Sequence, residues 1–414
     1  MPRLGAAFLA LSLMACASME QNTSVPANGV EYRGGRWFDG SRFVPRTMYV
    51  ADGVFHATAP ARIDSVVDLA GGYVVPPFAD AHQHLIDPRI EATIEAQLRD
   101  GIFYVKDQAN APIMRRLIDP AVNRPGSIDF VSANQGWTSP GGHPVVLVRR
   151  GAEMGGPMAA YVRDSLDPGI VMQVASTADI DRRWSYFLTG KPDFVKVYLF
   201  YSEDHERLRD DPAAEGNRGI DPRLVPEIVR RAEAAGLQVS AHVYTAADFR
   251  NALNSGVHHI AHLPGGRGPD SLFVLTDADA ALAARRGVTV ATTVSQHLDS
   301  VLTERLLRTQ YARNIEVLRK HDVPLLIGSD LFPGTAATEI DALAGSGLFS
   351  NLELLRMWSV TTPRSIFPVR RIGALEEGYE ASFLVLREDP LADIGATRSI
   401  ALRVKQGVPV PVSP

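Results

Sequence analysis

The chain has 414 residues, of which 45% are hydrophobic and 21% are charged, and this composition excludes a largely disordered protein. It carries 42 lysines and arginines against 47 aspartates and glutamates, a formal net charge of −5, and the basic residues form no stripe. A nucleic-acid partner is therefore not expected. The length suits two or three domains, or one large barrel with an accessory unit.

The first sixteen residues have the pattern of an export signal. Arg3 precedes an apolar run that is too short to span a bilayer. The run ends in Leu13-Met14-Ala15-Cys16, which resembles the lipobox of bacterial lipoproteins, and Cys16 is the only cysteine in the chain. We expect a lipoprotein-type signal peptide over residues 1–16, with lipidation at Cys16, and a polar linker over residues 17–29.

The alternative reading of the same segment is a cleavage site of the A-x-A type at Ala15-Cys16-Ala17, which leaves no lipid anchor. Either reading predicts an exported protein in the periplasm. With lipidation, Ala17 after the cysteine favours sorting to the outer membrane. The membrane is then expected to be contacted only through the N-terminal lipid anchor.

Both ends of the remaining chain are rich in β-forming residues. Over residues 30–75, short stretches at 48–50 and 54–56 flank Asp52-Gly53, which is a strong hairpin signal. Over residues 368–414 the texture is the same, with strands predicted at 381–386 and 402–404. Two β-rich ends around a different middle predict a small β-sandwich domain built from both termini.

The middle of the chain, residues 76–367, alternates short apolar strands with amphipathic helices. One helix is predicted to start at Asp221-Pro222 and to close at Gly236, and Ser350 with Glu353 forms a capping box for another over residues 352–359. Eight strands are predicted, at residues 74–84, 102–105, 130–133, 194–199, 237–242, 259–262, 288–292 and 323–328. This α/β pattern predicts a (β/α)8 TIM barrel. A doubly wound parallel sheet is the alternative, but no G-x-G-x-x-G follows a strand.

Polar residues stand at the ends of the predicted barrel strands, where barrel enzymes have their active sites. Two histidines two positions apart point to the same face of the first strand. The other candidates stand in or at the ends of later strands. Four histidines, a lysine and an aspartate in this arrangement suit zinc or a similar metal. The candidates are His82, His84, Lys196, His242, His262 and Asp330.

The order of these residues resembles the amidohydrolase superfamily, and more narrowly its imidazolonepropionase-like and metal-dependent dipeptidase-like branch. The resemblance covers nearly the whole chain after the export signal. It rests on the six residues together with the stretches Pro76-Pro77-Phe78-Ala79-Asp80-Ala81-His82-Gln83-His84, Gly328-Ser329-Asp330 and Arg371-Ile372-Gly373-Ala374-Leu375-Glu376-Glu377-Gly378.

The resemblance implies a binuclear centre with two divalent ions, expected to be Zn²⁺. His82 and His84 would hold one ion with Asp330, and His242 and His262 would hold the other. Lys196, carboxylated by carbon dioxide, would bridge the two ions. Asp330 would also be catalytic, because it would accept a proton from the attacking water and pass it to the leaving group.

Two further residues are candidates for substrate contact. His143 lies in Ser139-Pro140-Gly141-Gly142-His143, which resembles a substrate loop of these enzymes, and it could polarise the substrate carbonyl or bind a carboxylate. Tyr198 lies two positions after Lys196 and shares its face, where it either touches substrate or packs in the barrel.

The function predicted from the sequence is hydrolysis of amide bonds in short peptides or N-acyl amino acids by a metal-activated water. The enzyme alternative is a cyclic-amide hydrolase or a deaminase, although Lys196 favours the two-metal hydrolases. The alternative of another class is a non-catalytic lipoprotein that keeps the barrel for binding. The expected partner is a small molecule or short peptide, and the sequence leaves open a homo-oligomer.

Overall fold

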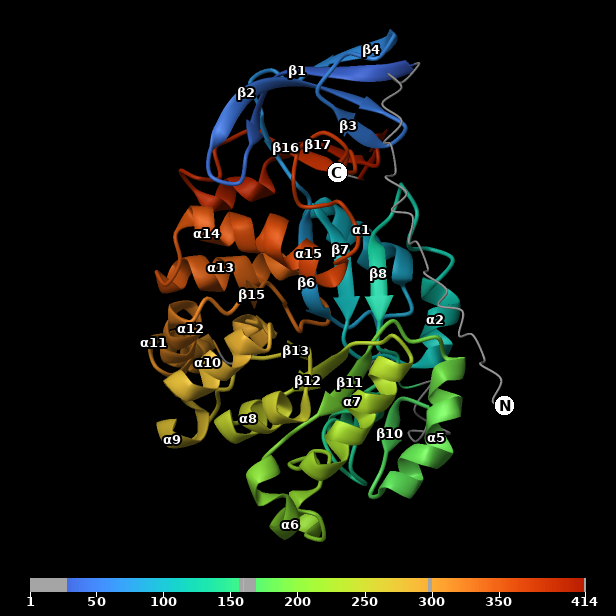
Figure 1. Ribbon diagram of the computed structural model, residues 1–414, viewed down its shortest axis with the longest axis vertical. Helices are drawn as coiled ribbons and strands as arrows, with labels where there is room; N and C mark the ends of the chain where they lie inside the picture. The colour runs from blue at the N-terminus through green and yellow to red at the C-terminus, as the bar shows by residue number, and fades with distance from the viewer. Residues whose placement is uncertain (1–27, 156–158, 160–168, 297–299, 413–414) are drawn as a thin grey trace, which may run out of the picture.

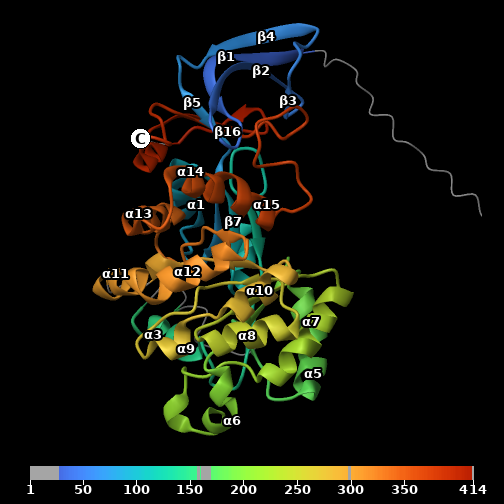
Figure 2. The ribbon, with the colours of Figure 1, turned by 60° about the vertical axis from the view of Figure 1, so that its left-hand side comes forward.

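The computed structural model describes residues 28–155, 159, 169–296 and 300–412. Within these residues the chain forms a mixed α/β fold with one mixed sheet and two parallel sheets, surrounded by helices (Figure 1). The mixed sheet lies at one end of the molecule, and the parallel strands with their helices form the larger remainder (Figure 2). The predicted α/β class is confirmed.

Strands from both ends of the described chain build the mixed sheet. Its order is β18-β17-β16-β5-β1-β2-β3, with β4 paired to β1. The early and late strands meet where β5 pairs antiparallel with β16, with Val74 opposite Val385. Because all of these strands join one ladder, the sheet does not show a distinct two-layered sandwich. The strands are β1 (Asn28–Phe38), β2 (Phe43–Ala51), β3 (Val54–His56), β4 (Arg62–Asp68), β5 (Tyr73–Val75), β16 (Phe383–Leu386), β17 (Ile400–Lys405) and β18 (Val408–Pro409).

The predicted hairpin at Asp52-Gly53 is confirmed. Strands β2 and β3 pair antiparallel up to Ala51 and Val54, which leaves a two-residue loop. Both loop residues have positive φ, 51° for Asp52 and 76° for Gly53. Two-residue hairpins of this kind require positive φ at both central positions, and aspartate followed by glycine adopts them most readily.

The parallel strands form two sheets and not one closed ladder of eight. The orders are β6-β7-β8 and β10-β9-β11-β12-β13-β14-β15. Beside β6 the sheets are joined by two backbone bonds, from Ala81 N–H to Ile327 O and from Asp330 N–H to His82 O. No ladder pairs β6 with β15 among the described residues, and β15 is only two residues long. The strands are β6 (Phe78–Gln83), β7 (Ile102–Asp107), β8 (Asp129–Ser132), β9 (Gly136–Thr138), β10 (Val171–Gln173), β11 (Val195–Tyr198), β12 (Val239–His242), β13 (His259–Ile260), β14 (Thr289–Ala291) and β15 (Leu325–Leu326).

The prediction of one strand over residues 74–84 is wrong. Strand β5 ends in the mixed sheet and β6 begins in a parallel sheet, with Pro76 and Pro77 between them. Proline has no backbone N–H to donate to a ladder, so the pair separates the two strands. Strands β9 and β10, each three residues long, are not among the predicted strands. The seven other predicted strands correspond to β7, β8 and β11 to β15.

The helix signals are largely confirmed. Asp221 accepts a hydrogen bond from Arg223 N–H at the start of a 3-10 turn, Pro222–Leu224, which leads into α7. Ser350 and Glu353 form the expected capping box of α14. The helices are α1 (Ile90–Arg99), α2 (Pro112–Ile118), α3 (Val145–Glu153), α5 (Thr177–Thr189), α6 (His205–Leu208), α7 (Val225–Ala234), α8 (Ala246–Ser255), α9 (Asp270–Phe273), α10 (Asp277–Arg285), α11 (Ser300–Arg308), α12 (Gln310–Lys320), α13 (Ala336–Ser346), α14 (Asn351–Arg356) and α15 (Thr362–Ile366).

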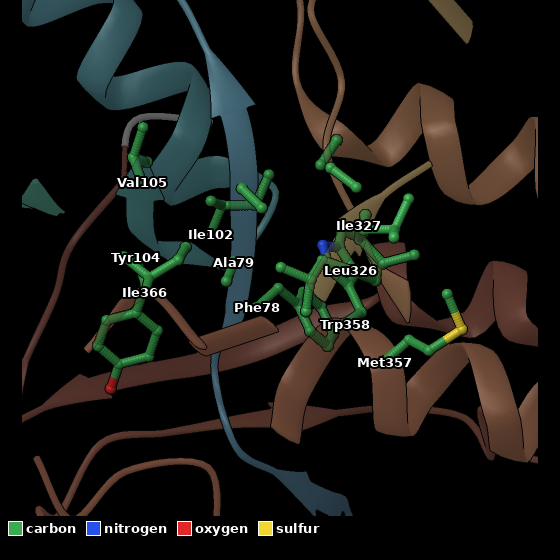
Figure 3. Packing of buried hydrophobic residues seen from close by; sticks show 14 of the residues in the cluster. Phe78, Ala79, Ile102, Tyr104, Val105, Leu326, Ile327, Met357, Trp358 and Ile366 are labelled. Carbon is green, nitrogen blue, oxygen red and sulfur yellow. The ribbon is translucent and has the colours of Figure 1, made fainter. Parts of the chain in front are cut away.

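An aromatic stack fixes the base of β6 (Figure 3). The rings of Phe78 and Trp358 lie parallel with centroids 3.9 Å apart, and both side chains are buried. Trp358 belongs to a π-helical turn, Met357–Thr361, that joins α14 to α15. Burying a phenylalanine stabilises a fold by about 1.5–3 kcal/mol. The strand that this contact holds carries His82 near its other end.

The predicted export signal, Cys16 and most of the linker lie outside the described residues. Within the described part of the chain, no helix has both the length and the apolar character needed to cross a membrane.

Candidate metal centre

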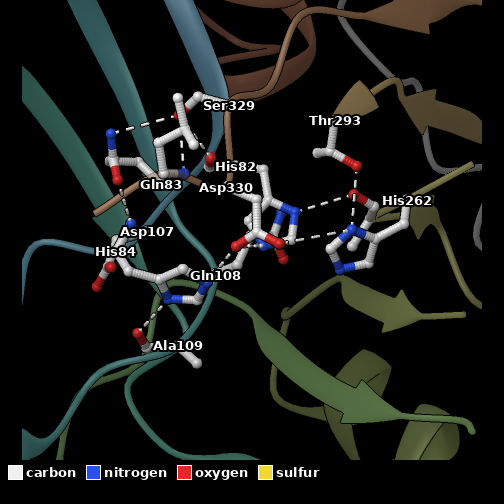
Figure 4. A network of polar contacts seen from close by, with 12 residues as sticks. His82, Gln83, His84, Asp107, Gln108, Ala109, His262, Thr293, Ser329 and Asp330 are labelled. Carbon is white, nitrogen blue, oxygen red and sulfur yellow. Dashed lines mark hydrogen bonds and ion pairs between the residues drawn. The ribbon is translucent and has the colours of Figure 1, made fainter. Parts of the chain in front are cut away.

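His82 in strand β6 and His84 just after its end bring two imidazoles together in one polar network (Figure 4). Nδ1 of His82 lies 2.9 Å from the carbonyl oxygen of Ala261, and Nδ1 of His84 lies 2.8 Å from that of Ala109. A carbonyl oxygen can only accept, so each Nδ1 carries the hydrogen. Each Nε2 therefore keeps a lone pair.

Both of these lone pairs face the Asp330 carboxylate. Oδ1 lies 3.1 Å from Nε2 of His84 and 3.4 Å from Nε2 of His82. Asp330 has a φ of 52°, a conformation that aspartate tolerates better than most residues, and its N–H donates to His82 O. When both imidazoles are neutral, three acceptor atoms converge with no donor among them, and only a cation or a proton can satisfy them together.

The pKa values at this point agree with that geometry. Burial alone would raise the pKa of Asp330, but the hydrogen bond with His84 and electrostatic interactions with His262, His84 and Lys196 lower it overall. For His84, burial opposes the protonated form, and the contact with Asp330 nevertheless raises its pKa. The site therefore attracts positive charge.

The other two predicted ligand histidines lie beside this group. Nδ1 of His262 lies 3.7 Å from Oδ2 of Asp330, and the rings of His242 and His262 are 4.4 Å apart between centroids. Nε2 of His242 is buried and has no hydrogen-bond partner among the residues that the structure describes. Burial holds the pKa of both histidines well below the usual value, so both are neutral and offer lone pairs.

Lys196 is buried on β11 with 1% of its surface exposed. Its Nζ donates to Oε1 of Gln108 at 3.3 Å, and the same oxygen accepts a hydrogen bond from Ser240. Burial lowers the pKa of Lys196 to about 7. A large share of the amine is therefore neutral at neutral pH, which is the form that reacts with carbon dioxide.

His143 and Tyr198 border the site without a hydrogen bond to any predicted ligand in the described residues. The His143 ring stacks on His242, with centroids 4.6 Å apart, and on Phe200 at 5.0 Å. Tyr198 is buried, and its ring lies 5.7 Å from that of His143. Burial lowers the pKa of His143 to about 4, so this imidazole is neutral at pH 7.

The residues present fit a divalent cation. The ligand atoms of His82, His262 and Asp330 lie within 4.8 Å of one another, and His84 joins the group through Asp330. Imidazole nitrogen and carboxylate oxygen are donors that zinc prefers. The unpartnered His242 Nε2 offers a further donor. The structure thus brings together the six residues singled out in the sequence, and His143 and Tyr198 beside them.

Three residues around the ligands have no role predicted from the sequence. Asp80, fully buried, accepts hydrogen bonds from the backbone N–H groups of His82 and Ser329 and from the Ser329 hydroxyl. Gln108 holds Lys196, and Thr293 contacts His262 Nδ1 at 3.0 Å. Asp80 stands two positions before His82, and the alternation of a strand is a signal for it. Nothing in the sequence points to Gln108 or Thr293.

The family model named Amidohydrolase family matches residues 203–410, just over half of the 414 residues. The chain belongs to the amidohydrolase family. The class of protein expected from the sequence, a hydrolase of carbon–nitrogen bonds, is the class to which this family belongs. The matched segment contains His242, His262 and Asp330.

Ochratoxinase from Aspergillus niger is 24% identical over 182 residues, which cover 42% of this chain and 38% of that protein. The chain therefore aligns with about two fifths of this relative's length. The crystal structure of A. niger ochratoxinase has a TM-score of 0.72 at 17% identity and covers 93% of this chain and 96% of that one. A prolidase complexed with N-methylphosphonate-L-proline has a TM-score of 0.72 at 18% identity, with 93% and 100% covered. A Xaa-Pro dipeptidase has a TM-score of 0.69 at 14% identity, with 92% and 99% covered. These structures share the fold.

Proposed function

We propose that this protein is a metal-dependent amidohydrolase that cleaves amide bonds in short peptides or N-acyl amino acids. The observation that carries the proposal is the convergence of His82 Nε2, His84 Nε2 and Asp330 Oδ1 at distances of 3.1–3.4 Å with no donor among them. A buried lysine with a lowered pKa beside such a cluster is typical of catalytic sites, which favours an enzyme over a binding protein.

The residues would hold two divalent ions. His82, His84 and Asp330 would ligate one, His242 and His262 the other, and Lys196, once carboxylated, would bridge them. A neutral amine cannot bridge two cations, whereas a carbamate offers two oxygens that share a negative charge, one for each ion. Bound divalent ions at such a site lower the pKa of a water molecule towards about 7 and polarise the carbonyl of the substrate.

The protein's own groups would move the proton and hold the substrate. The Asp330 carboxylate would accept the proton of the attacking water and deliver it to the departing nitrogen. His143 is neutral at pH 7 and partly exposed, so its ring N–H can donate to a substrate carbonyl or carboxylate oxygen. Tyr198 would form part of the wall beside it. The His143 ring stacks on Phe200 with centroids 5.0 Å apart, a contact that favours this orientation of the imidazole.

A peptide-like substrate is supported by the names of the relatives. Prolidase and Xaa-Pro dipeptidase are structural neighbours over nearly the whole chain, and ochratoxinase is both a sequence and a structural neighbour. A dipeptidase-like branch of the family is the assignment that agrees best with these names. The substrate would be a small molecule or short peptide, since the reacting groups lie at the end of the parallel strands.

For the fold, we propose the (β/α)8 barrel over residues 76–367, with a β-sandwich built from residues 30–75 and 368–414. The two backbone bonds beside β6 support closure of the barrel, and TM-scores near 0.7 to amidohydrolases support its type. For the location, we propose export and an outer-membrane lipid anchor at Cys16.

The direct test is a library of dipeptides and N-acyl amino acids offered to zinc-loaded protein without residues 1–16. Release of a free amine from one or more members, at rates of about 1–10³ per second for the best substrate, would support the proposal. Cleavage restricted to ring amides, or release of ammonia from a ring, would point to the cyclic-amide hydrolase or deaminase. No turnover by metal-loaded, folded protein would contradict it.

A further inference from the structure

Thr293 has a backbone conformation that is rare for its side chain. Its φ is 42°, and it is completely buried two residues after the end of β14. A β-branched residue at positive φ is a genuine outlier, because its Cβ substituents crowd the backbone. Such conformations persist only where the surroundings enforce them, and they gather at functional sites.

The conformation brings the Thr293 hydroxyl into contact with His262. Oγ1 of Thr293 lies 3.0 Å from Nδ1 of His262 (Figure 4). When Nδ1–H donates to this hydroxyl, Nε2 of His262 keeps the lone pair that a cation needs. The left-handed turn therefore places the hydroxyl where it can fix both the tautomer and the ring orientation of His262.

One carboxylate on α13, that of Glu339, accepts hydrogen bonds from residues on both sides of Thr293 and so holds the turn. Glu339 is completely buried, and its Oε1 accepts hydrogen bonds from the Thr292 hydroxyl at 2.5 Å and from Val294 N–H at 3.0 Å. Its Oε2 accepts from Ser295 N–H at 2.8 Å. The three donors lie on both sides of Thr293, so the carboxylate holds the turn from its two ends.

We propose that Glu339 is a positioning residue, which clamps residues 292–295 so that Thr293 holds the His262 ring in its metal-binding orientation. The inference rests on the proposed function, since it assigns a purpose to His262. It assigns a positioning role to α13, a helix that contributes none of the proposed ligands. The chemistry of the clamp is specific for a carboxylate, because two backbone N–H groups and a hydroxyl all require acceptors.

The experiment compares the full chain with the variants Thr293→Val, Thr293→Ser and Glu339→Gln. Valine removes the hydroxyl at nearly constant shape, serine retains it, and glutamine turns one acceptor of the clamp into a donor that faces an N–H or a hydroxyl. Glu353→Gln on α14 is the matched control, because its carboxylate also accepts a backbone N–H and a hydroxyl, both from Ser350, but lies in an exposed capping box.

Two readouts are measured, zinc affinity in competition with a chelator and the ¹⁵N signals of His262 in metal-free protein. Loss of such an outer contact typically weakens metal binding by about 10- to 100-fold. We expect that loss at one of the bound ions in Thr293→Val and Glu339→Gln, recovery of most of the affinity in Thr293→Ser, and no change in Glu353→Gln. In metal-free Thr293→Val, the His262 signals should shift towards mixed tautomers.

Wild-type affinity and unchanged His262 signals in Thr293→Val would overturn the proposal while leaving the metal site itself intact. Failure of the wild type to bind zinc would instead reject the proposed function. If Glu339→Gln does not fold, the comparison of valine with serine at position 293 still tests the role of the hydroxyl. The role of the carboxylate is then tested with Glu339→Asp, by the rise in melting temperature that zinc causes. A smaller rise than in the wild type supports the clamp, and an equal rise contradicts it.

Discussion

The carboxylate of Asp330 lies 3.1 Å from Nε2 of His84. The contact joins the residue just after the first parallel strand, β6, to the segment that follows the last one, β15, and the backbone bond from Asp330 N–H to His82 O reinforces it. The proposed catalytic group and two proposed ligands are therefore positioned by the same local structure. We expect a substitution at Asp330 to lower the rate of the reaction more than it lowers the stability of the fold.

Asp330→Asn is expected to lower kcat by about 10²- to 10⁴-fold while changing substrate affinity little. Asparagine can still offer an oxygen to a cation, but it cannot accept a proton at neutral pH. Steady-state kinetics with metal content measured in parallel would check this. Asp341→Asn, on the exposed side of α13, is the control. Near-normal kcat in the Asp330 variant would remove this residue from the mechanism.

Lys196→Ala is expected to lose most of the bound metal together with the activity. The alanine variant has no amine to carry the bridging carbamate, and short carboxylates added to the buffer should restore part of the activity. Elemental analysis of the purified variant provides the measurement. Lys320→Ala, which removes an exposed lysine, should keep both metal and activity. Full metal occupancy without Lys196 would refute the bridging role.

The burial of Lys106 predicts that the free energy of unfolding depends on pH. It is buried on β7 with its Nζ 4.4 Å from the centroid of the Phe194 ring, and no described carboxylate forms an ion pair with it. Burial lowers the pKa of Lys106 from 10.5 to about 7. Between these values the unfolded chain binds a proton that the folded chain does not, so the stability of the wild type rises with pH.

Lys106→Met should therefore be more stable than the wild type, with the largest advantage at and below pH 7 and a decreasing advantage towards pH 10. Urea unfolding at pH 6.5 and pH 9.5 measures the two differences in free energy of unfolding. Lys320→Met should show no comparable pH dependence. If Lys106→Met is more stable than the wild type by the same free energy at both pH values, then the lowered pKa of the buried lysine does not cause the gain in stability.

The location of the protein can be tested separately from its chemistry. The segment Leu13-Met14-Ala15-Cys16 predicts lipidation, and a lipidated cysteine with two or more acyl chains anchors a protein stably. Full-length protein should fractionate with membranes, and Cys16→Ser should not. Equal membrane association of the two proteins would contradict lipidation, and wild-type protein in the cytosol with Met1 retained would contradict export.

Much of the fold follows from local patterns in the sequence. Asp52-Gly53 specifies its hairpin because both loop residues need positive φ, and Ser350 with Glu353 specifies the start of α14. Strand β9 could not be predicted, because its three residues show no apolar alternation. They are buried because neighbouring strands cover them. The joining of β5 to β16 depends on partners that are far apart in the sequence.

The candidate site was predictable to the extent that strand ends meet at one edge of a parallel sheet. Alternation puts His82 and His84 on one face, and the order of the later histidines and Asp330 completes the set. Thr293 and Glu339 could not be found in this way. Their roles depend on a left-handed turn and on the packing of α13 against it, and neither leaves a periodic signal.

The most direct test of the central claim is a titration of metal against turnover. Protein stripped with a chelator is reloaded with increasing zinc, and bound ions per chain and hydrolysis of the best amide substrate are measured on the same samples. The account predicts that stripped protein is inactive and that turnover rises with bound zinc and saturates near two ions per chain, as expected for a two-metal site. Full turnover in stripped protein, or saturation with zinc and no amide hydrolysis, would contradict it.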